Sequence, residues 1–81
     1  MRIDFNPYAI IYTDDTDIYD VYFIIIDETE KTIDVCDNQG FSIANIHYEN
    51  AKEIGCLYYG DDERLNGDSD IIVKNGELRI E

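Results

Sequence analysis

Positive charge is scarce in this chain: six lysines and arginines stand against nineteen aspartates and glutamates in 81 residues, a formal net charge of −13. Without a basic cluster, we expect no direct binding to nucleic acid or to anionic lipid. No apolar run approaches the roughly 20 residues that a membrane-spanning helix needs, and the first residues lack the pattern of a signal peptide. These absences predict a cytoplasmic protein without membrane association.

Cysteine and histidine are also rare, with two Cys and one His. Small secreted scaffolds usually carry about four cysteines or more, so we interpret Cys36 and Cys56 as buried thiols. A single disulfide between them is the alternative. Neither belongs to a Cys-x-x-Cys pair, and His47 alone cannot complete a tetrahedral site, so no metal centre is expected. His47 follows an apolar run and is interpreted as a structural residue at a strand end.

Motifs for catalysis and cofactors are missing as well. The sequence has no glycine-rich phosphate loop and no dinucleotide fingerprint, and no nucleophile has a credible base. An EF-hand starting at Asp62 would place Arg64 and Val73 at ligand positions, and the loop at Asp14 has no glycine. A carboxylate-pair hydrolase needs a substrate cleft, which a chain this short rarely builds. We therefore expect no enzyme and no cofactor.

Apolar residues, by contrast, are plentiful: 44% of the chain is hydrophobic and 12% is aromatic, including seven tyrosines. Disordered acidic chains are poor in aromatic and β-branched residues. The composition therefore predicts a folded protein, and its length predicts a single domain over residues 1–81.

The strongest local signal is Asn75-Gly76 between two apolar runs, which predicts a hairpin with a type I′ turn. The register can be counted outward from the turn. It pairs Lys74 with Glu77, Val73 with Leu78, Ile72 with Arg79 and Ile71 with Ile80. Apolar residues then share one face of the hairpin, as a buried face requires.

The remaining chain is also rich in strand-forming residues. Residues 21–26, 32–36 and 41–46 predict a three-stranded meander, with turns at 27–31 and 37–40 and Gly40 in the left-handed region. The irregular apolar phase of 41–46 predicts a bulge or an early end of that strand. Two strands are expected at residues 2–5 and 8–12, broken at Asn6-Pro7 and followed by an acidic loop at 13–20.

Residues 48–55 contain helix formers and end at Gly55, which suits a helix C-terminus. A short strand at 56–59 and an acidic loop at 60–68 follow. Together these elements predict a mostly β domain, with α+β as a possibility: a small antiparallel sheet or partly open barrel of about five to seven strands, with one short helix near residues 48–55.

Acidic residues cluster in three of the predicted loops and turns, at 14–20, 27–30 and 61–70. Loops commonly hold solvated charges, but most soluble domains intersperse both signs. Tyrosines flank the first and third clusters, and tyrosine is enriched at protein interfaces. The candidate partner-binding residues are Asp14, Asp15, Asp17, Asp20, Asp61, Asp62, Glu63, Tyr12, Tyr19, Tyr58 and Tyr59.

Carboxylates that imitate the spacing of phosphates can occupy a groove made for DNA or RNA. In size and charge the chain is similar to phage-encoded inhibitors of bacterial defence, such as anti-CRISPR and anti-restriction proteins. The sequence thus favours an inhibitor, a monomer or small homo-oligomer, that binds a basic nucleic-acid-binding protein such as a nuclease, CRISPR effector or toxin. Two alternatives stay open: an immunity protein or antitoxin against a basic nuclease toxin, and a β-rich structural or assembly module.

Overall fold

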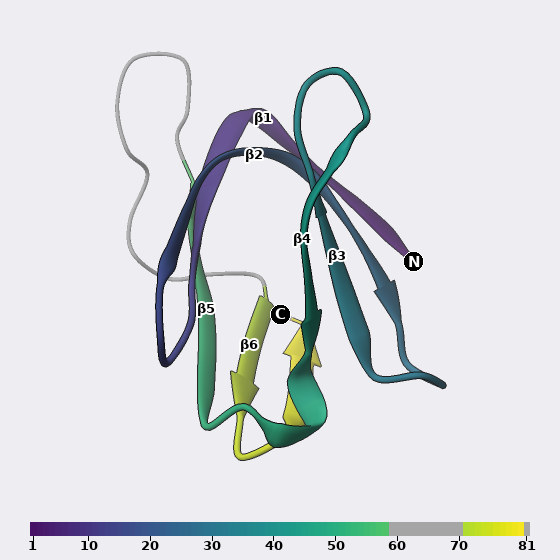
Figure 1. The fold of residues 1–81 in the computed structure, drawn as a ribbon, viewed down its shortest axis with the longest axis vertical. Helices are drawn as coiled ribbons and strands as arrows, with labels where there is room; N and C mark the ends of the chain where they lie inside the picture. Colours follow the sequence, from purple (N-terminus) through teal and green to yellow (C-terminus); the bar gives the residue numbers. More distant parts are fainter. Residues whose placement is uncertain (59–70, 81) are drawn as a thin grey trace.

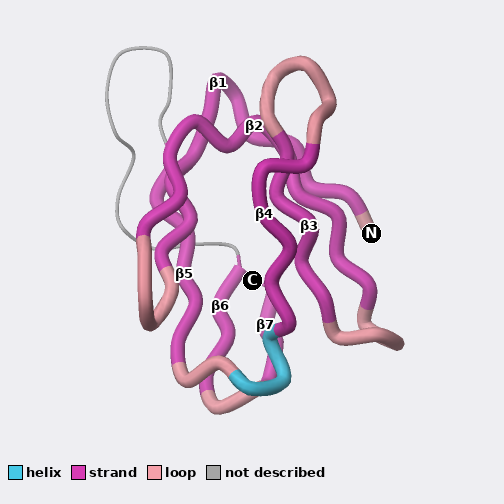
Figure 2. The backbone as a smooth tube through the Cα atoms, viewed as in Figure 1, coloured by secondary structure: helices cyan, strands magenta, loops and turns pink. Residues whose placement is uncertain are grey.

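The computed structural model describes residues 1–58 and 71–80, and Figure 1 shows their arrangement. Seven strands form one antiparallel sheet in the order β4-β3-β2-β1-β5-β6-β7. Their bounds are β1 Arg2–Tyr12, β2 Asp17–Asp27, β3 Thr32–Cys36, β4 Ser42–His47, β5 Glu53–Tyr58, β6 Ile71–Lys74 and β7 Glu77–Ile80, with one 3₁₀ turn, η1, at Tyr48–Asn50. The sheet curls into an open half-barrel (Figure 2). The mostly β, antiparallel fold predicted from the sequence is confirmed.

The curl comes from the two long strands β1 and β2, which bend over together. Their register shifts between Asp4 and Ala9 and again between Ala9 and Ile11, and Asp20 of β2 takes a positive φ of 57° near the second shift. Such bulges bend a strand and increase its twist. Among the described strands, the first part of β1 pairs with β2 alone, whereas the part from Ala9 onward also pairs with β5.

Two predictions near the N-terminus need correction. The strands expected at residues 2–5 and 8–12 are one strand, because Asn6-Pro7 falls within the register shift and not at a chain break. A proline has no N–H for the ladder, and an irregular stretch tolerates it. The acidic loop expected over 13–20 is also shorter, since β2 already begins at Asp17.

The core fills the inside of the curl: β1, β2, β3, β5 and β6 contribute buried residues, and β4 and β7 contribute partly buried residues packed against them. Cys36 and Cys56 are 2% and 0% exposed, so both thiols are buried as predicted. Among the described residues, the largest fully buried side chains are Ile11, Ile24, Ile33 and Ile54, followed by Val21, Val35, Val73 and Cys56.

Both predicted hairpin regions are confirmed. β6 and β7 pair in the expected register around Asn75 and Gly76, whose φ angles are 50° and 79°. β2, β3 and β4 form the expected meander, with Gly40 at φ 88°. The bulge expected in residues 41–46 is present as a register shift opposite Val35 and Cys36.

The helix predicted near residues 48–55 is wrong beyond its first turn. Only Tyr48–Asn50 forms a 3₁₀ turn, and β5 begins at Glu53. Gly55 does not end a helix but pairs with Tyr12 in the sheet. Tertiary contacts override the weak helical propensity here, because β1 supplies a ladder for residues 55–58 and the start of β5 is bonded by a distant side chain, described below.

Candidate partner-binding surface

Residues 48–53, which comprise η1 and the start of β5, are hydrogen-bonded to turns from other parts of the chain. Asp14, in the loop between β1 and β2, uses both carboxylate oxygens here. Its Oδ2 accepts the N–H of Lys52 and its Oδ1 accepts the N–H of Glu53, each at 2.8 Å. Tyr48 donates its N–H to the carbonyl of Lys31, in the turn between β2 and β3, at 3.0 Å. Two turns are thereby tied to this segment.

The turn between β6 and β7 is tied to the same segment. Asn75 donates its N–H to the carbonyl of Lys52 at 2.8 Å, and Gly76 donates to the carbonyl of Ala51 at 2.9 Å. Gly76 lies so close to the Glu49 carbonyl oxygen that a Cβ there would be 2.5 Å from it. Three turns therefore meet around η1, at the lower end of the molecule in Figure 1.

We call this end of the molecule the acidic end. It carries nine carboxylates and three lysines, a formal net charge of −6. The acidic members are Asp14, Asp15, Asp17, Asp27, Glu28, Glu30, Glu49, Glu53 and Glu77, and the lysines are Lys31, Lys52 and Lys74. Two of the three acidic clusters seen in the sequence thus contribute to one end of the fold.

Salt bridges do not neutralise these carboxylates. Among residues 1–58 and 71–80, the only ion pair joins Arg2 to Asp4, at 3.0 Å, and both side chains are more than half exposed. Arg2 also lies over the ring of Phe23, 3.8 Å from its centroid. This pair does not include any of the nine carboxylates, and all nine of their residues are exposed, so the charge of the acidic end faces solvent.

The loop of residues 13–16 is held in place by its own hydrogen bonds. The Thr13 hydroxyl accepts the N–H groups of Asp15 and Thr16, at 3.2 and 3.1 Å, and donates to the Thr16 carbonyl at 3.0 Å. With Asp14 bonded to β5, the loop presents the exposed Asp15 carboxylate from a fixed backbone. Asp17 follows as the first residue of β2 and pairs with Tyr12.

The other predicted residues are distributed differently. Asp20 is exposed on β2, outside the acidic end. Tyr12 is half-buried, with its ring against Gly55, whereas Tyr19 is 60% exposed. Tyr58 ends β5, but its side chain, like Tyr59, Asp61, Asp62 and Glu63, lies outside the described residues.

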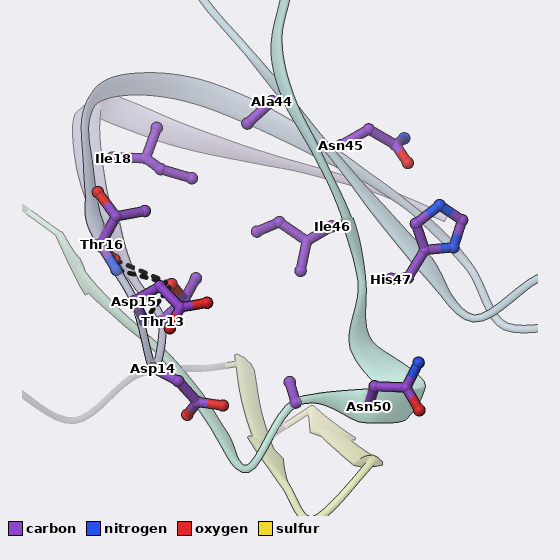
Figure 3. Close-up of a pocket in the computed structure, with 11 residues that line it drawn as sticks. Thr13, Asp14, Asp15, Thr16, Ile18, Ala44, Asn45, Ile46, His47 and Asn50 are labelled. Carbon is purple, nitrogen blue, oxygen red and sulfur yellow. Dashed lines mark hydrogen bonds between the residues drawn. The ribbon is translucent and has the colours of Figure 1, made fainter.

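Sequence reasoning missed a groove of about 430 Å³ beside the acidic end. In Figure 3 the loop of residues 13–16 and Ile18 form one side, and β4 with Asn50 forms the other. Ala44 and Ile46 point into it, while Asn45 and His47 point away. The sequence identified Asp14 and Asp15 in one wall, but the other wall was marked only by the irregular apolar phase of residues 41–46, since the two walls are far apart in the chain.

Neither of the two groups with a shifted pKa offers reactive chemistry. Burial raises the pKa of the Cys36 thiol, and the nearby Asp34 carboxylate, whose Oδ2 is 3.9 Å from Sγ, raises it further. Burial likewise raises the pKa of the Tyr48 phenol, with Glu28 and Asp27 adding to the effect. Both groups stay protonated at neutral pH, which makes Cys36 a poor nucleophile.

Within the described ranges, no three His, Cys, Asp or Glu side chains are grouped to hold a metal ion. The same ranges contain no helix with the length and apolarity to cross a membrane. No family model, curated protein or solved structure matches the chain significantly, so its function is argued from its own residues.

Proposed function

We propose that this chain is a small acidic inhibitor that binds the basic nucleic-acid-binding surface of a DNA- or RNA-processing protein. Such an inhibitor would be a phage-encoded anti-defence protein, of the anti-CRISPR or anti-restriction type, that acts in the cytoplasm of a bacterial host cell. The observation that carries it is the acidic end, where turns distant in sequence place nine carboxylates against three lysines. A surface of this kind attracts a basic groove over long range.

The rigidity of the acidic end supports the proposal. Backbone hydrogen bonds and the Asp14 carboxylate tie the turns to residues 48–53, so the backbone positions that carry the carboxylates are held relative to one another before a partner arrives. A ligand already ordered in this way loses less conformational entropy on binding than a flexible acidic tail. Fixed positions also let carboxylates imitate the spacing of phosphates.

Aromatic contacts add to the charge. Tyr19 is 60% exposed on β2, two residues after Asp17. A tyrosine ring can lie against a guanidinium group and donate a hydrogen bond from its hydroxyl. We therefore assign the long-range attraction to the acidic end and a short-range contact with arginine to Tyr19.

The test uses two variants with the same net charge. D15N/E28Q removes two exposed carboxylates from the acidic end, and D4N/D20N removes two from elsewhere. Wild type and both variants are immobilised and used to capture proteins from host lysate, which are eluted with stepped salt. The association rate of the captured protein is then measured against ionic strength.

We expect wild type to retain a nucleic-acid-processing protein that salt releases, that an oligonucleotide displaces and that is inhibited when bound. D15N/E28Q should slow its association and flatten the salt dependence more than D4N/D20N does. Equal effects of the two variants would show that the acidic end is not the binding surface and would contradict the proposal. A captured protein that nucleic acid does not displace would contradict the proposal.

A further inference from the structure

β4 has an open edge. It is the last strand at one end of the sheet and pairs only with β3 among the described strands. Tyr48, directly after β4, donates its N–H to the Lys31 carbonyl, directly before β3. In an antiparallel ladder the direction of these groups alternates from residue to residue. The backbone N–H and C=O groups of Asn45 and His47 therefore face the open edge.

The groove described above runs along this edge. Four consecutive residues of β4, from Ala44 to His47, line it, so it follows the strand's backbone as well as one face (Figure 3). Its other wall includes Ile18, near the start of β2. Among the described strands, none pairs with that part of β2 on the side of β3, because the β2–β3 ladder covers only Phe23 to Asp27.

β4 lacks two of the usual protections of an edge strand, and its bulge lies between Ser42 and Ala44, before the residues that face the open edge. Natural edge strands carry charged residues or proline that prevent pairing with another chain. β4 has no charged residue and no proline, its Ile43 is 45% exposed, and the preceding Phe41 is 64% exposed. An open backbone edge next to exposed apolar side chains is a surface on which an extended peptide adds a strand.

We propose that this groove binds an extended segment of the basic partner, which adds a strand to β4. A lysine or arginine of that segment would lie beside Asp15, and an aliphatic side chain would lie against Ile18, Ala44 and Ile46. Charge selects this occupant over a second copy of the chain: Asp14 and Asp15 line the groove, and two copies at −13 repel each other. The basic character of the segment rests on the function proposed above.

The first test is a pair of variants at one position. N45P removes the N–H on the open edge and adds a ring there, but leaves the groups that bond β3 in place. N45A changes the side chain and keeps the N–H. The probe is a fluorescent nine-residue peptide that alternates lysine or arginine with valine, and binding is read from anisotropy.

We expect the peptide to bind wild type, N45A to change its affinity by less than about twofold, and N45P to weaken it at least about tenfold. D15N should weaken binding about two- to fivefold by removing a charge at the groove, whereas D20N, which removes the same charge outside it, should not. Equal binding by N45P and N45A, or equal binding of a peptide with glutamate in place of the basic residues, would overturn the proposal.

Two further measurements keep the proposal testable should N45P fold poorly. N-methylating alternate peptide residues, in each of the two phases, should abolish binding to wild type in one phase only, because a strand bonds its neighbour through alternate residues. Hydrogen exchange should show new protection at the amides of Asn45 and His47 when the peptide is bound. Protection elsewhere, or equal binding of both methylated peptides, would overturn strand addition.

The groove and the proposed function can fail separately. If N45P does not alter peptide binding while D15N/E28Q still slows association with the captured protein, the groove proposal is wrong and the inhibitor function stands. If N45P weakens peptide binding while D15N/E28Q and D4N/D20N associate alike, the function proposal is wrong. Sedimentation adds one more outcome: a dimer of wild type that N45P dissociates would identify a second copy as the occupant and overturn the proposal.

Discussion

The ring of Tyr12 on β1 covers Gly55 on β5, its direct partner across the strand pair. A Cβ built at Gly55 would overlap the ring's outer carbon and hydroxyl oxygen. Gly55 is buried. Because it has no side chain, the Tyr12 ring can lie against the β5 backbone. This contact joins the end of the first strand to the far half of the sheet.

G55A should therefore destabilise the fold by about 1–3 kcal/mol, because the Tyr12 ring must move to admit a methyl group. In a Y12L background the cost should fall, since a leucine leaves more room over β5. Urea unfolding of the two single variants and the double variant gives the coupling energy between the two sites. Additive effects would show that the ring is not what limits residue 55 to glycine.

Asp14 should matter to stability more than Asp15. D14A leaves the N–H groups of Lys52 and Glu53 without their acceptor, and we expect a loss of about 1–2 kcal/mol in unfolding free energy. D15N removes a charge from the same loop but no hydrogen bond made by that side chain in the described structure. Equal urea midpoints for the two variants would contradict this role of Asp14.

Gly40 and Gly76 form a matched pair for a second stability test. Both have positive φ, but a Cβ at Gly40 meets nothing within 4 Å, whereas a Cβ at Gly76 meets the Glu49 carbonyl oxygen. G40A should cost about 1–2 kcal/mol from backbone conformation alone. G76A should cost more, about 2–4 kcal/mol, because it also forces the β6–β7 turn away from η1. Thermal unfolding of the two variants checks the order.

Alkaline pH should destabilise the protein. The pKa values of Cys36 and Tyr48 are raised in the folded state from ordinary values of 9.0 and 10.0. The unfolded chain then releases these protons first, so the contribution of these two groups to stability is fully present below about pH 9 and is lost as pH rises through the folded values. Unfolding free energy measured from pH 7 to 11 tests this.

C36A should remove the part of the alkaline loss of stability that begins near pH 9. A pH dependence unchanged by C36A would show that the Cys36 thiol is not linked to folding. The raised pKa of Tyr48 would then account for the slope.

Local sequence signals predicted the parts of the fold that local geometry determines. Asn75-Gly76 fixes a two-residue turn, and the register of β6 and β7 follows from counting outward from it. Gly40 was predicted in the left-handed region for the same reason. In these hairpins the partners of each residue are only a few positions away in the chain.

Non-local contacts explain why the helix predicted near residues 48–55 is wrong. Residues 48–55 have helical propensity, but Asp14, 38 and 39 residues away, accepts the N–H groups of Lys52 and Glu53. β1 then pairs with β5 from Gly55 onward. The sequence of residues 48–55 contains no signal of these contacts.

The candidate site also has a part that the sequence predicted and a part that it did not. The acidic clusters at 14–20 and 27–30 were visible in the sequence. Their placement at one end of the molecule depends on backbone hydrogen bonds that involve distant turns. The groove could not be found, because Ile18 and Ile46 become neighbours only after the sheet has curled.

The bonds around residues 48–53 hold like charges together against their mutual repulsion. Neutral backbone groups make most of these bonds, so salt screens the repulsion between carboxylates far more than it weakens the contacts that oppose it. Cations that gather at the acidic end of the folded chain should accordingly raise its melting temperature. The same ions compete with a basic partner for that surface. Salt should thus stabilise the free protein and weaken its complex with the partner. In the complex, basic groups of the partner would neutralise the carboxylates that small cations neutralise in the free protein.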